Sequence, residues 1–254
     1  MRRTMVLGAL LAVGALSVAV AGQQQRATLP DLQKVKDNFY IIGASNPGER
    51  GGFTGGNVSV FVTDGGVVVV DSKLAGYGPD IIAKIRAVTT KPITTLINTH
   101  THGDHTGSNS FFPANVEIVT QANTSANMAK MPAFQSATGK VGLPDRTFTD
   151  KLTLFSGRES VDLYYFGAGH TNGDLVVVFP AKRIAYLGDL FPYKAVPVID
   201  AANGGSARAR RVTSRCMRGG LPSSTSLSPI ANVVSFLRLG FETRKSLESL
   251  ASKS

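Results

Sequence analysis

The sequence is poor in cysteine and histidine, and these two shortages exclude several kinds of protein. Its 254 residues contain a single cysteine, Cys216, so an internal disulfide framework and a multi-cysteine zinc ribbon are excluded. No cysteine comes directly after the N-terminal apolar run, which also excludes a lipoprotein anchor. Only four histidines occur, and three of them (His100, His102 and His105) lie within six residues. This clustering of a rare residue type indicates a functional site.

Charged residues are also few, at 17% of the chain, and they are unevenly placed. The formal net charge is +10, but residues 206–254 hold nine Lys/Arg and only two Asp/Glu. A nucleic-acid-binding protein more often spreads its basic residues over a folded face, among aromatic side chains. We therefore expect no nucleic-acid partner and interpret the tail as a solvated basic segment. The alternative, a basic interaction module that acts through the tail, predicts salt-sensitive binding to polyanions.

The longest apolar run is short for a membrane span, which needs about 20 residues. This run, at 5–21, follows Arg2 and Arg3 and ends in an A-x-A pattern. Residues 1–21 therefore predict a cleaved secretory signal peptide, and no stable membrane span is expected after its removal. In a bacterium, such a leader sends the protein to the periplasm or out of the cell. A retained N-terminal anchor is the alternative interpretation.

Strand and helix patterns follow one another in an order typical of an α/β protein. The four valines before Asp71 suit a strand that is covered on both faces. Strands are expected at 35–42, 57–63, 67–71, 93–99, 116–120, 152–155, 161–166, 174–179 and 183–187, helices at 78–90 and from about 120 to 130, and a long loop at 131–150. Hairpins, then strand–helix–strand units, then a second set of strands predict two facing sheets with helices outside. The expected fold is a four-layer αββα sandwich.

A His-Thr-His-Gly-Asp-His run at 100–105 directly follows the strand expected at 93–99. Imidazole nitrogen and carboxylate oxygen are the usual zinc ligands where cysteine is absent. The spacing places alternating side chains on one side of the chain, before Gly103 gives the backbone freedom to turn. The sequence therefore predicts a metal site built from His100, His102, Asp104 and His105.

Two later loops support the same site. The fourth histidine, His170, lies in a glycine-flanked loop at the end of a strand. Asp189 follows an apolar strand in a Gly-Asp turn. Either pattern alone is weak, because a Gly-Asp pair after a strand is usually only a turn. Together with the histidine cluster, both residues are predicted to be metal ligands.

In these motifs the sequence resembles the metallo-β-lactamase-fold hydrolases, over roughly residues 35–206. Besides H-T-H-G-D-H-T-G, it has G-G-N at 55–57, V-V-D ending at Asp71, G-H-T-N-G-D at 169–174 and G-D-L-F at 188–191. The resemblance is closest to the broad group of periplasmic metallohydrolases in that superfamily. It implies that residues 22–206 form one metallo-β-lactamase-like domain.

The resemblance also implies two zinc ions and a role for each motif residue. The first ion would be bound by His100, His102 and His170, the second by Asp104 and His105, and both by the bridging Asp189. Asp71 would steady the histidine loop. A hydroxide generated between the ions would attack an ester, lactam or thioester bond of a small-molecule substrate. Asp104 would act in catalysis by taking or delivering a proton.

The resemblance ends abruptly after Ser206. The family has one more ligand, a histidine in a P-G-H-type loop, but no histidine follows His170 here, and Cys216 lies in an arginine-rich stretch without a strand pattern. Eleven of the last 49 residues are serine, and the amphipathic helix expected there is missing. We expect an incomplete domain followed by an atypical basic, serine-rich tail at 207–254. A frameshift near codon 206 is our hypothesis, which the other reading frames of the gene would test.

Two consequences follow from this departure. A second site with fewer ligands should bind zinc more weakly, so one or two ions are expected in all. The missing helix and strand should leave one sheet edge and one helix face uncovered.

The leading hypothesis is an exported zinc hydrolase, for which the Gly-Asp turn favours glyoxalase-like or lactonase-like chemistry over a true metallo-β-lactamase. The alternative is a truncated pseudoenzyme that binds one zinc and has little or no activity.

Overall fold

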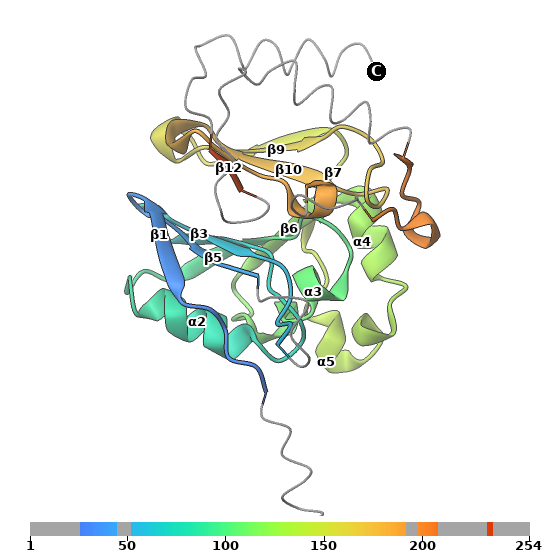
Figure 1. Cartoon of the computed structure of the whole chain (residues 1–254), viewed down its shortest axis with the longest axis horizontal. Coiled ribbons are helices and arrows are strands. Elements are labelled where there is room, and N and C mark those ends of the chain that lie inside the picture. The colour runs from blue at the N-terminus through green and yellow to red at the C-terminus, as the bar shows by residue number, and fades with distance from the viewer. Residues whose placement is uncertain (1–25, 45–51, 192–197, 208–232, 236–254) are drawn as a thin grey trace, which may run out of the picture.

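The computed structural model describes residues 26–44, 52–191, 198–207 and 233–235 (Figure 1). Two β-sheets lie face to face, and the helices α2 (Gly78–Arg86), α3 (Gly103–Thr106) and α5 (Ala137–Lys140) lie outside the first of them. This arrangement confirms the predicted α/β sandwich. The helix layer outside the second sheet and the uncovered helix face stay predictions, and the leader lies outside the described residues. Within the described ranges, no helix is both long and apolar enough to cross a membrane.

The first sheet contains seven strands in sequence order, from β1 to β7. The first four pair antiparallel, whereas β4 to β7 pair in parallel. Their bounds are β1 Leu32–Lys36, β2 Phe39–Ile42, β3 Val58–Val62, β4 Val67–Val70, β5 Ile93–Ile97, β6 Glu117–Gln121 and β7 Arg146–Phe148. Because β4, β5 and β6 are parallel, their carboxyl ends meet at one edge of the sheet.

The strand β4 is buried on both faces, as its four consecutive valines predict. Val68 and Val70 pack between the two sheets, in a core with Ile97, Leu163 and Val177. The alternate side chains Val67 and Val69 face the other way, toward the helix α2 (Gly78–Arg86) and its buried Ile81 and Ile85. This two-residue alternation is the geometry of a strand, and it brings apolar side chains to both layers.

The single strand expected at 35–42 is instead a hairpin of β1 and β2. The chain turns between them at Asp37 and Asn38, and Asn38 has φ = +59°. Asparagine adopts this left-handed conformation more readily than most residues, so a turn fits between the two strands. The expected helix at 78–90 is also shorter, since α2 ends at Arg86.

The long loop expected at 131–150 contains three short elements. They are the 3-10 helix η2 (Pro132–Phe134), the helix α5 (Ala137–Lys140) and the strand β7. The Ser136 hydroxyl accepts a hydrogen bond from the Gly139 N–H and so caps α5. The loop prediction was wrong because elements of three or four residues leave almost no periodic pattern in the sequence.

The second sheet has the order β12-β11-β10-β9-β8, and all its pairs are antiparallel. The bounds are β8 Lys151–Leu154, β9 Val161–Tyr165, β10 Leu175–Phe179, β11 Ile184–Tyr186 and β12 Val233–Ser235. The strand β12 pairs with β11, so the sheet edge that the sequence led us to expect as uncovered is in fact paired. Backbone pairing requires only an extended segment, and it depends little on which side chains that segment carries.

Candidate metal centre

The structure brings all six predicted ligands to one end of the sandwich. His100 and His102 come just after β5, and Asp104 and His105 lie on the short helix α3 (Gly103–Thr106). The remaining two come from the second sheet: His170 lies between β9 and β10, and Asp189 lies in the 3-10 helix η5 (Gly188–Leu190) after β11. The site therefore forms where strand ends of the two facing sheets meet.

Three imidazoles converge in the first group, which consists of His100, His102 and His170. Nδ1 of His102 lies 3.2 Å from Nε2 of His100 and 2.8 Å from Nε2 of His170. The offered ligand atoms of the group all lie within 4.8 Å of one another. Nitrogen atoms this close can bind one metal ion together.

The outer nitrogen of each of these rings has its own hydrogen-bond acceptor. Nε2 of His102 lies 2.7 Å from Oδ2 of Asp200, and Nδ1 of His170 lies 2.8 Å from the backbone oxygen of Val198. A carbonyl oxygen and an ionised carboxylate only accept, so these outer nitrogens carry the protons.

Nδ1 of His100 completes the pattern, since it lies 3.1 Å from the Thr99 hydroxyl oxygen. That hydroxyl donates its own proton to Asp71, so it accepts one from His100. In neutral rings the inner nitrogens are then unprotonated, and their lone pairs face one another. Lone pairs at these distances repel unless a cation lies between them, so the group fits a metal ion.

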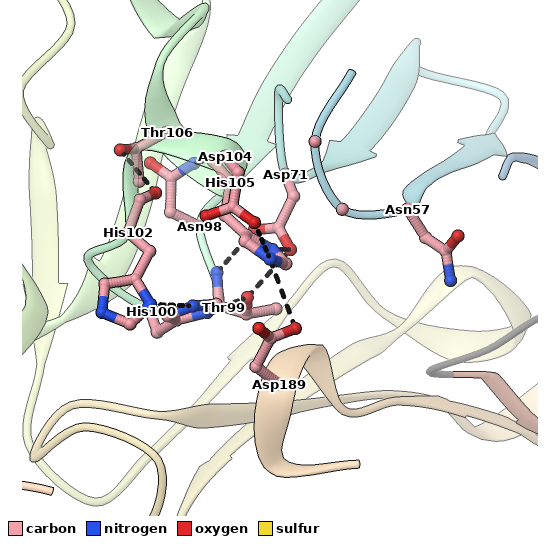
Figure 2. Close-up of polar contacts among 12 residues, drawn as sticks. Asn57, Asp71, Asn98, Thr99, His100, His102, Asp104, His105, Thr106 and Asp189 are labelled. Carbon is pink, nitrogen blue, oxygen red and sulfur yellow. Dashed lines mark hydrogen bonds and ion pairs between the residues drawn. The ribbon is translucent and has the colours of Figure 1, made fainter. Parts of the chain in front are cut away.

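His105 forms the centre of a second group, in which its ring lies near Asp104 and Asp189 (Figure 2). Its side chain is fully buried, and Nδ1 lies 2.7 Å from Oδ2 of Asp71. Nε2 has no hydrogen-bond partner among the described residues, although it lies 3.3 Å from Oδ1 of Asp189 and 3.6 Å from Oδ2 of Asp104. A buried nitrogen that faces two carboxylates without a hydrogen bond also fits a metal ligand.

The two groups have opposite electrostatic surroundings. Burial lowers the pKa of His100 well below its usual value, and the neighbouring histidines add to that effect. Burial alone would also lower the pKa of His105, but the negative charges of Asp71 and Asp189 raise it well above its usual value. His100 therefore stays neutral, which is the form that binds metal, while the carboxylates around His105 favour a positive charge there.

Asp71 connects the metal centre to the first sheet. Its Oδ1 accepts a hydrogen bond of 2.8 Å from the Thr99 N–H, and its Oδ2 accepts one of 2.8 Å from the Thr99 hydroxyl as well as the one from His105. The residue is fully buried and has φ = +64°, a conformation that costs free energy outside glycine. These bonds give Asp71 the geometry to hold both the His105 ring and the start of the histidine loop.

The backbone of Gly56 passes directly against the His105 ring. The Gly56 N–H donates a 3.0 Å hydrogen bond to the backbone oxygen of Asp104. A β-carbon at Gly56 would lie 2.3 Å from Cε1 of His105, closer than any real contact. The glycine is required here because the backbone fills the space in which another residue would carry a side chain.

Lys73 anchors the backbone at Gly56 through its side chain. Its side chain is buried, and Nζ donates hydrogen bonds of 2.7 Å to the Gly56 oxygen and 2.9 Å to the Gly43 oxygen. Burial lowers the pKa of Lys73 to about 7, against the opposing charge of Asp104. No carboxylate forms an ion pair with it within the described part of the chain.

The sequence patterns do not identify Asp200, Thr99, Lys73 or the Val198 carbonyl as parts of the site. The segment 198–206 reaches the histidines through backbone bonds, because the Asp200 N–H bonds the His170 oxygen at 2.8 Å and the Ser206 N–H bonds the Gly169 oxygen at 2.9 Å. No residue-type pattern signals such contacts. Cys216, the one other ligand candidate that the sequence offered, lies outside the described residues.

Comparisons with known proteins identify the family of the chain. The family model described as the metallo-beta-lactamase superfamily matches residues 51–223. The chain is 27% identical over 192 residues to a metallo-beta-lactamase type 2 of Elizabethkingia meningoseptica, an alignment that covers 72% of this chain and 70% of that protein.

Solved structures show the same fold. A metallo-beta-lactamase from Pontibacter korlensis matches with a TM-score of 0.63 at 20% identity, covering 89% of this chain and 100% of that one. The metallo-beta-lactamase FIM-1 from Pseudomonas aeruginosa, in its mono-zinc form, matches with a TM-score of 0.60 at 17% identity, covering 91% and 98%. At these identities the structural likeness concerns the fold alone.

Proposed function

This chain belongs to the metallo-beta-lactamase superfamily, and from that premise we propose that it is an exported zinc-dependent hydrolase of ester, lactam or thioester bonds. Membership supports a metal-dependent hydrolase. The observation that supports zinc as the metal is the first histidine group. Its three outer nitrogens are hydrogen-bonded to acceptors, and its three inner nitrogens face one another. Imidazole ligands of this kind suit zinc.

In this proposal each of the two groups would hold one zinc ion. Bound zinc lowers the pKa of a water to about neutral and polarises a carbonyl oxygen. His100, His102 and His170 would hold the first ion, and Asp104 and His105 the second. Asp189 would serve both, since its Oδ1 lies 3.3 Å from Nε2 of His105 and its Oδ2 lies 3.7 Å from Nε2 of His170.

Asp104 is our candidate for proton transfer. Its side chain is 25% exposed, whereas that of His105 beside it is fully buried. A carboxylate that reaches both the ligand cluster and solvent can accept a proton from water at the site and deliver it to a leaving group. The buried His105 would orient the site without exchanging protons with solvent.

Zinc content and chelator-sensitive hydrolysis test the proposal together. The mature protein, beginning near Gly22, would be analysed for zinc per folded chain and assayed with a nitrophenyl ester, a lactone, a thioester and a chromogenic cephalosporin. We expect hydrolysis of at least one of these, loss of it with a chelator, and recovery with zinc. Folded, zinc-loaded protein without activity on any of them would contradict the hydrolase proposal.

The observation that favours the second candidate, a one-zinc pseudoenzyme, concerns the second group. Among the described residues, the compact ligand group that contains His105 also includes His100, which already belongs to the first group, so only Asp104 and Asp189 are left beside His105. Sharing a ligand weakens the second site. One zinc per chain together with no turnover would support the pseudoenzyme.

The curated relative is named a metallo-beta-lactamase, so a true β-lactamase is the narrower alternative within the hydrolase proposal. A preference for the cephalosporin over the ester and the thioester would support it. The basic interaction module is the third candidate, and only polyanion binding that is lost on deletion of residues 206–254 would favour it. Localisation to the periplasm or the medium is proposed from the leader at 1–21, and cell fractionation would test it.

A further inference from the structure

A tyrosine from the second sheet contacts the carboxylate that orients His105. Tyr186 is the last residue of β11, and its side chain is fully buried. Its hydroxyl lies 3.2 Å from Oδ2 of Asp71, the same oxygen that accepts hydrogen bonds from Thr99 and His105. Three donors from three segments therefore meet on one carboxylate oxygen.

The same hydroxyl also reaches the segment that leads into β3. It donates to the backbone oxygen of Asn57 at 2.5 Å, so its single proton is shared between this oxygen and Asp71. Burial raises the pKa of Tyr186 well above its usual value, and the negative charge of Asp71 raises it further, so the phenol keeps its proton and acts as a donor. A buried phenol that found no acceptor would cost free energy.

Tyr186 lies three residues before Asp189 on the same strand-to-turn segment. Asp71 directly follows β4 of the first sheet, and His105 lies on α3, which comes after β5 of the same sheet. The hydroxyl therefore joins the segment that carries Asp189 to the segments that carry the opposing His105. These two segments face each other at Asp189 and His105, whose nearest side-chain atoms lie 3.3 Å apart.

We propose that Tyr186 is a positioning residue of the metal centre, whose hydroxyl orients Asp71 and, through it, the His105 imidazole against Asp189. The consequence for metal binding rests on the proposed function, but the orientation of His105 is a property of the metal-free protein. Outer hydrogen-bond partners of ligands commonly change metal affinity by 10- to 100-fold when they are removed.

The alternative is that Tyr186 only fills space. Its ring packs in the core between the sheets with Phe39, Phe179 and Leu163. Tyr186→Phe separates the two roles because it keeps the ring and removes only the hydroxyl. Tyr77→Phe is a matched control, since Tyr77 is also buried and its hydroxyl donates to a backbone oxygen, that of Ala27 at 3.0 Å.

The deciding measurement is a long-range ¹H–¹⁵N correlation spectrum of the histidine side chains in metal-free protein. With four histidines in the chain, each ring can be assigned by substitution. We expect Tyr186→Phe to shift the ¹⁵N resonances of His105 and to leave those of His102 and His170 in place, and we expect Tyr77→Phe to shift none of them. Unchanged His105 resonances in folded Tyr186→Phe protein would overturn the proposal.

A cobalt titration then measures the consequence for binding. Tyr186→Phe should weaken cobalt binding at the His105 group by about 10-fold or more and leave the three-histidine group unchanged. Equal cobalt affinities at the His105 group in the variant and in the wild type would overturn the positioning role. If the wild type binds cobalt only at the three-histidine group, or hydrolyses nothing, the two-metal hydrolase proposal fails, while the metal-free spectra still decide the role of Tyr186.

Discussion

Nε2 of His102 lies 2.7 Å from Oδ2 of Asp200, although 98 positions separate the two residues in the sequence. The carboxylate is also held by Asn203, whose backbone N–H bonds Oδ1 at 3.2 Å and whose side-chain amide bonds Oδ2 at 2.5 Å. These bonds to Asn203, together with the one to His102, lower the pKa of Asp200 far below its usual value. Asp200 is therefore a fixed acceptor that selects the His102 tautomer with a free Nδ1.

Replacing Asp200 by alanine should weaken zinc binding by about 10-fold or more, because His102 loses the acceptor that fixes its tautomer. Competition with a chromogenic chelator measures the affinity. Asp31→Ala is the control, since that carboxylate is 99% exposed and forms an ion pair with Lys84, away from the histidines. An affinity equal to that of the wild type would show that Asp200 does not orient His102.

Metal removal should destabilise the protein, since it leaves three unprotonated nitrogens facing one another. Zinc at 100 times its dissociation constant would raise the free energy of unfolding by about 2.7 kcal/mol. Thermal unfolding with and without zinc measures the difference. Magnesium serves as the control ion because it prefers oxygen ligands and should give no comparable shift. An unfolding temperature that is insensitive to zinc would contradict the assignment of the three-histidine group.

Gly56→Ala should displace the His105 ring, because the new β-carbon would lie 2.3 Å from Cε1 and 2.6 Å from Nε2. We expect metal binding at the His105 group to be lost and binding at the three-histidine group to be retained. Cobalt absorption spectra resolve the two environments. Gly65→Ala is the matched control, since a β-carbon there has nothing within 4 Å. If Gly56→Ala binds metal like the wild type at both groups, then His105 is not a metal ligand whose position depends on Gly56.

Lys73 predicts a pH dependence of stability in the metal-free protein. Its pKa is lowered from 10.5 to about 7 in the folded state, chiefly by burial, so the unfolded chain binds more protons between these values. The free energy of unfolding should therefore rise with pH from about 7 toward 10, with a slope that approaches about 1.4 kcal/mol per pH unit. The cost of burying the charge is fully present below pH 7 and disappears above the unfolded pKa.

Denaturant unfolding at several pH values, in wild-type and Lys73→Met protein, measures this slope. The variant lacks the titrating group and should show a flatter profile over the same range. Its stability relative to the wild type at pH 7 also reports how far the loss of the bonds to Gly43 and Gly56 offsets the relief of the buried charge. Parallel profiles in the two proteins would show that Lys73 does not titrate in this range.

The ligand motifs were predictable because their signals are local. A rare residue type clustered at 100–105 after a buried strand, and strand-terminal loops that carry His170 and Asp189, are visible without any knowledge of packing. Most strands were also predictable, since apolar alternation and the valine run of β4 reflect burial directly. The sequence did not predict the turn at Asn38 or the small elements within 131–150, because they are too short to produce a periodic pattern of apolar residues.

The sequence by itself determined which residues have metal-binding chemistry and that the strands form two layers, because both depend on residue type and on spacing along the chain. Only the tertiary structure decided which partners hold those residues. Asp200 reaches His102, Tyr186 reaches Asp71, and β12 covers the edge of β11 across long stretches of chain. A hydrogen bond depends on the direction and separation of two groups in space, and the packing of the two sheets sets both.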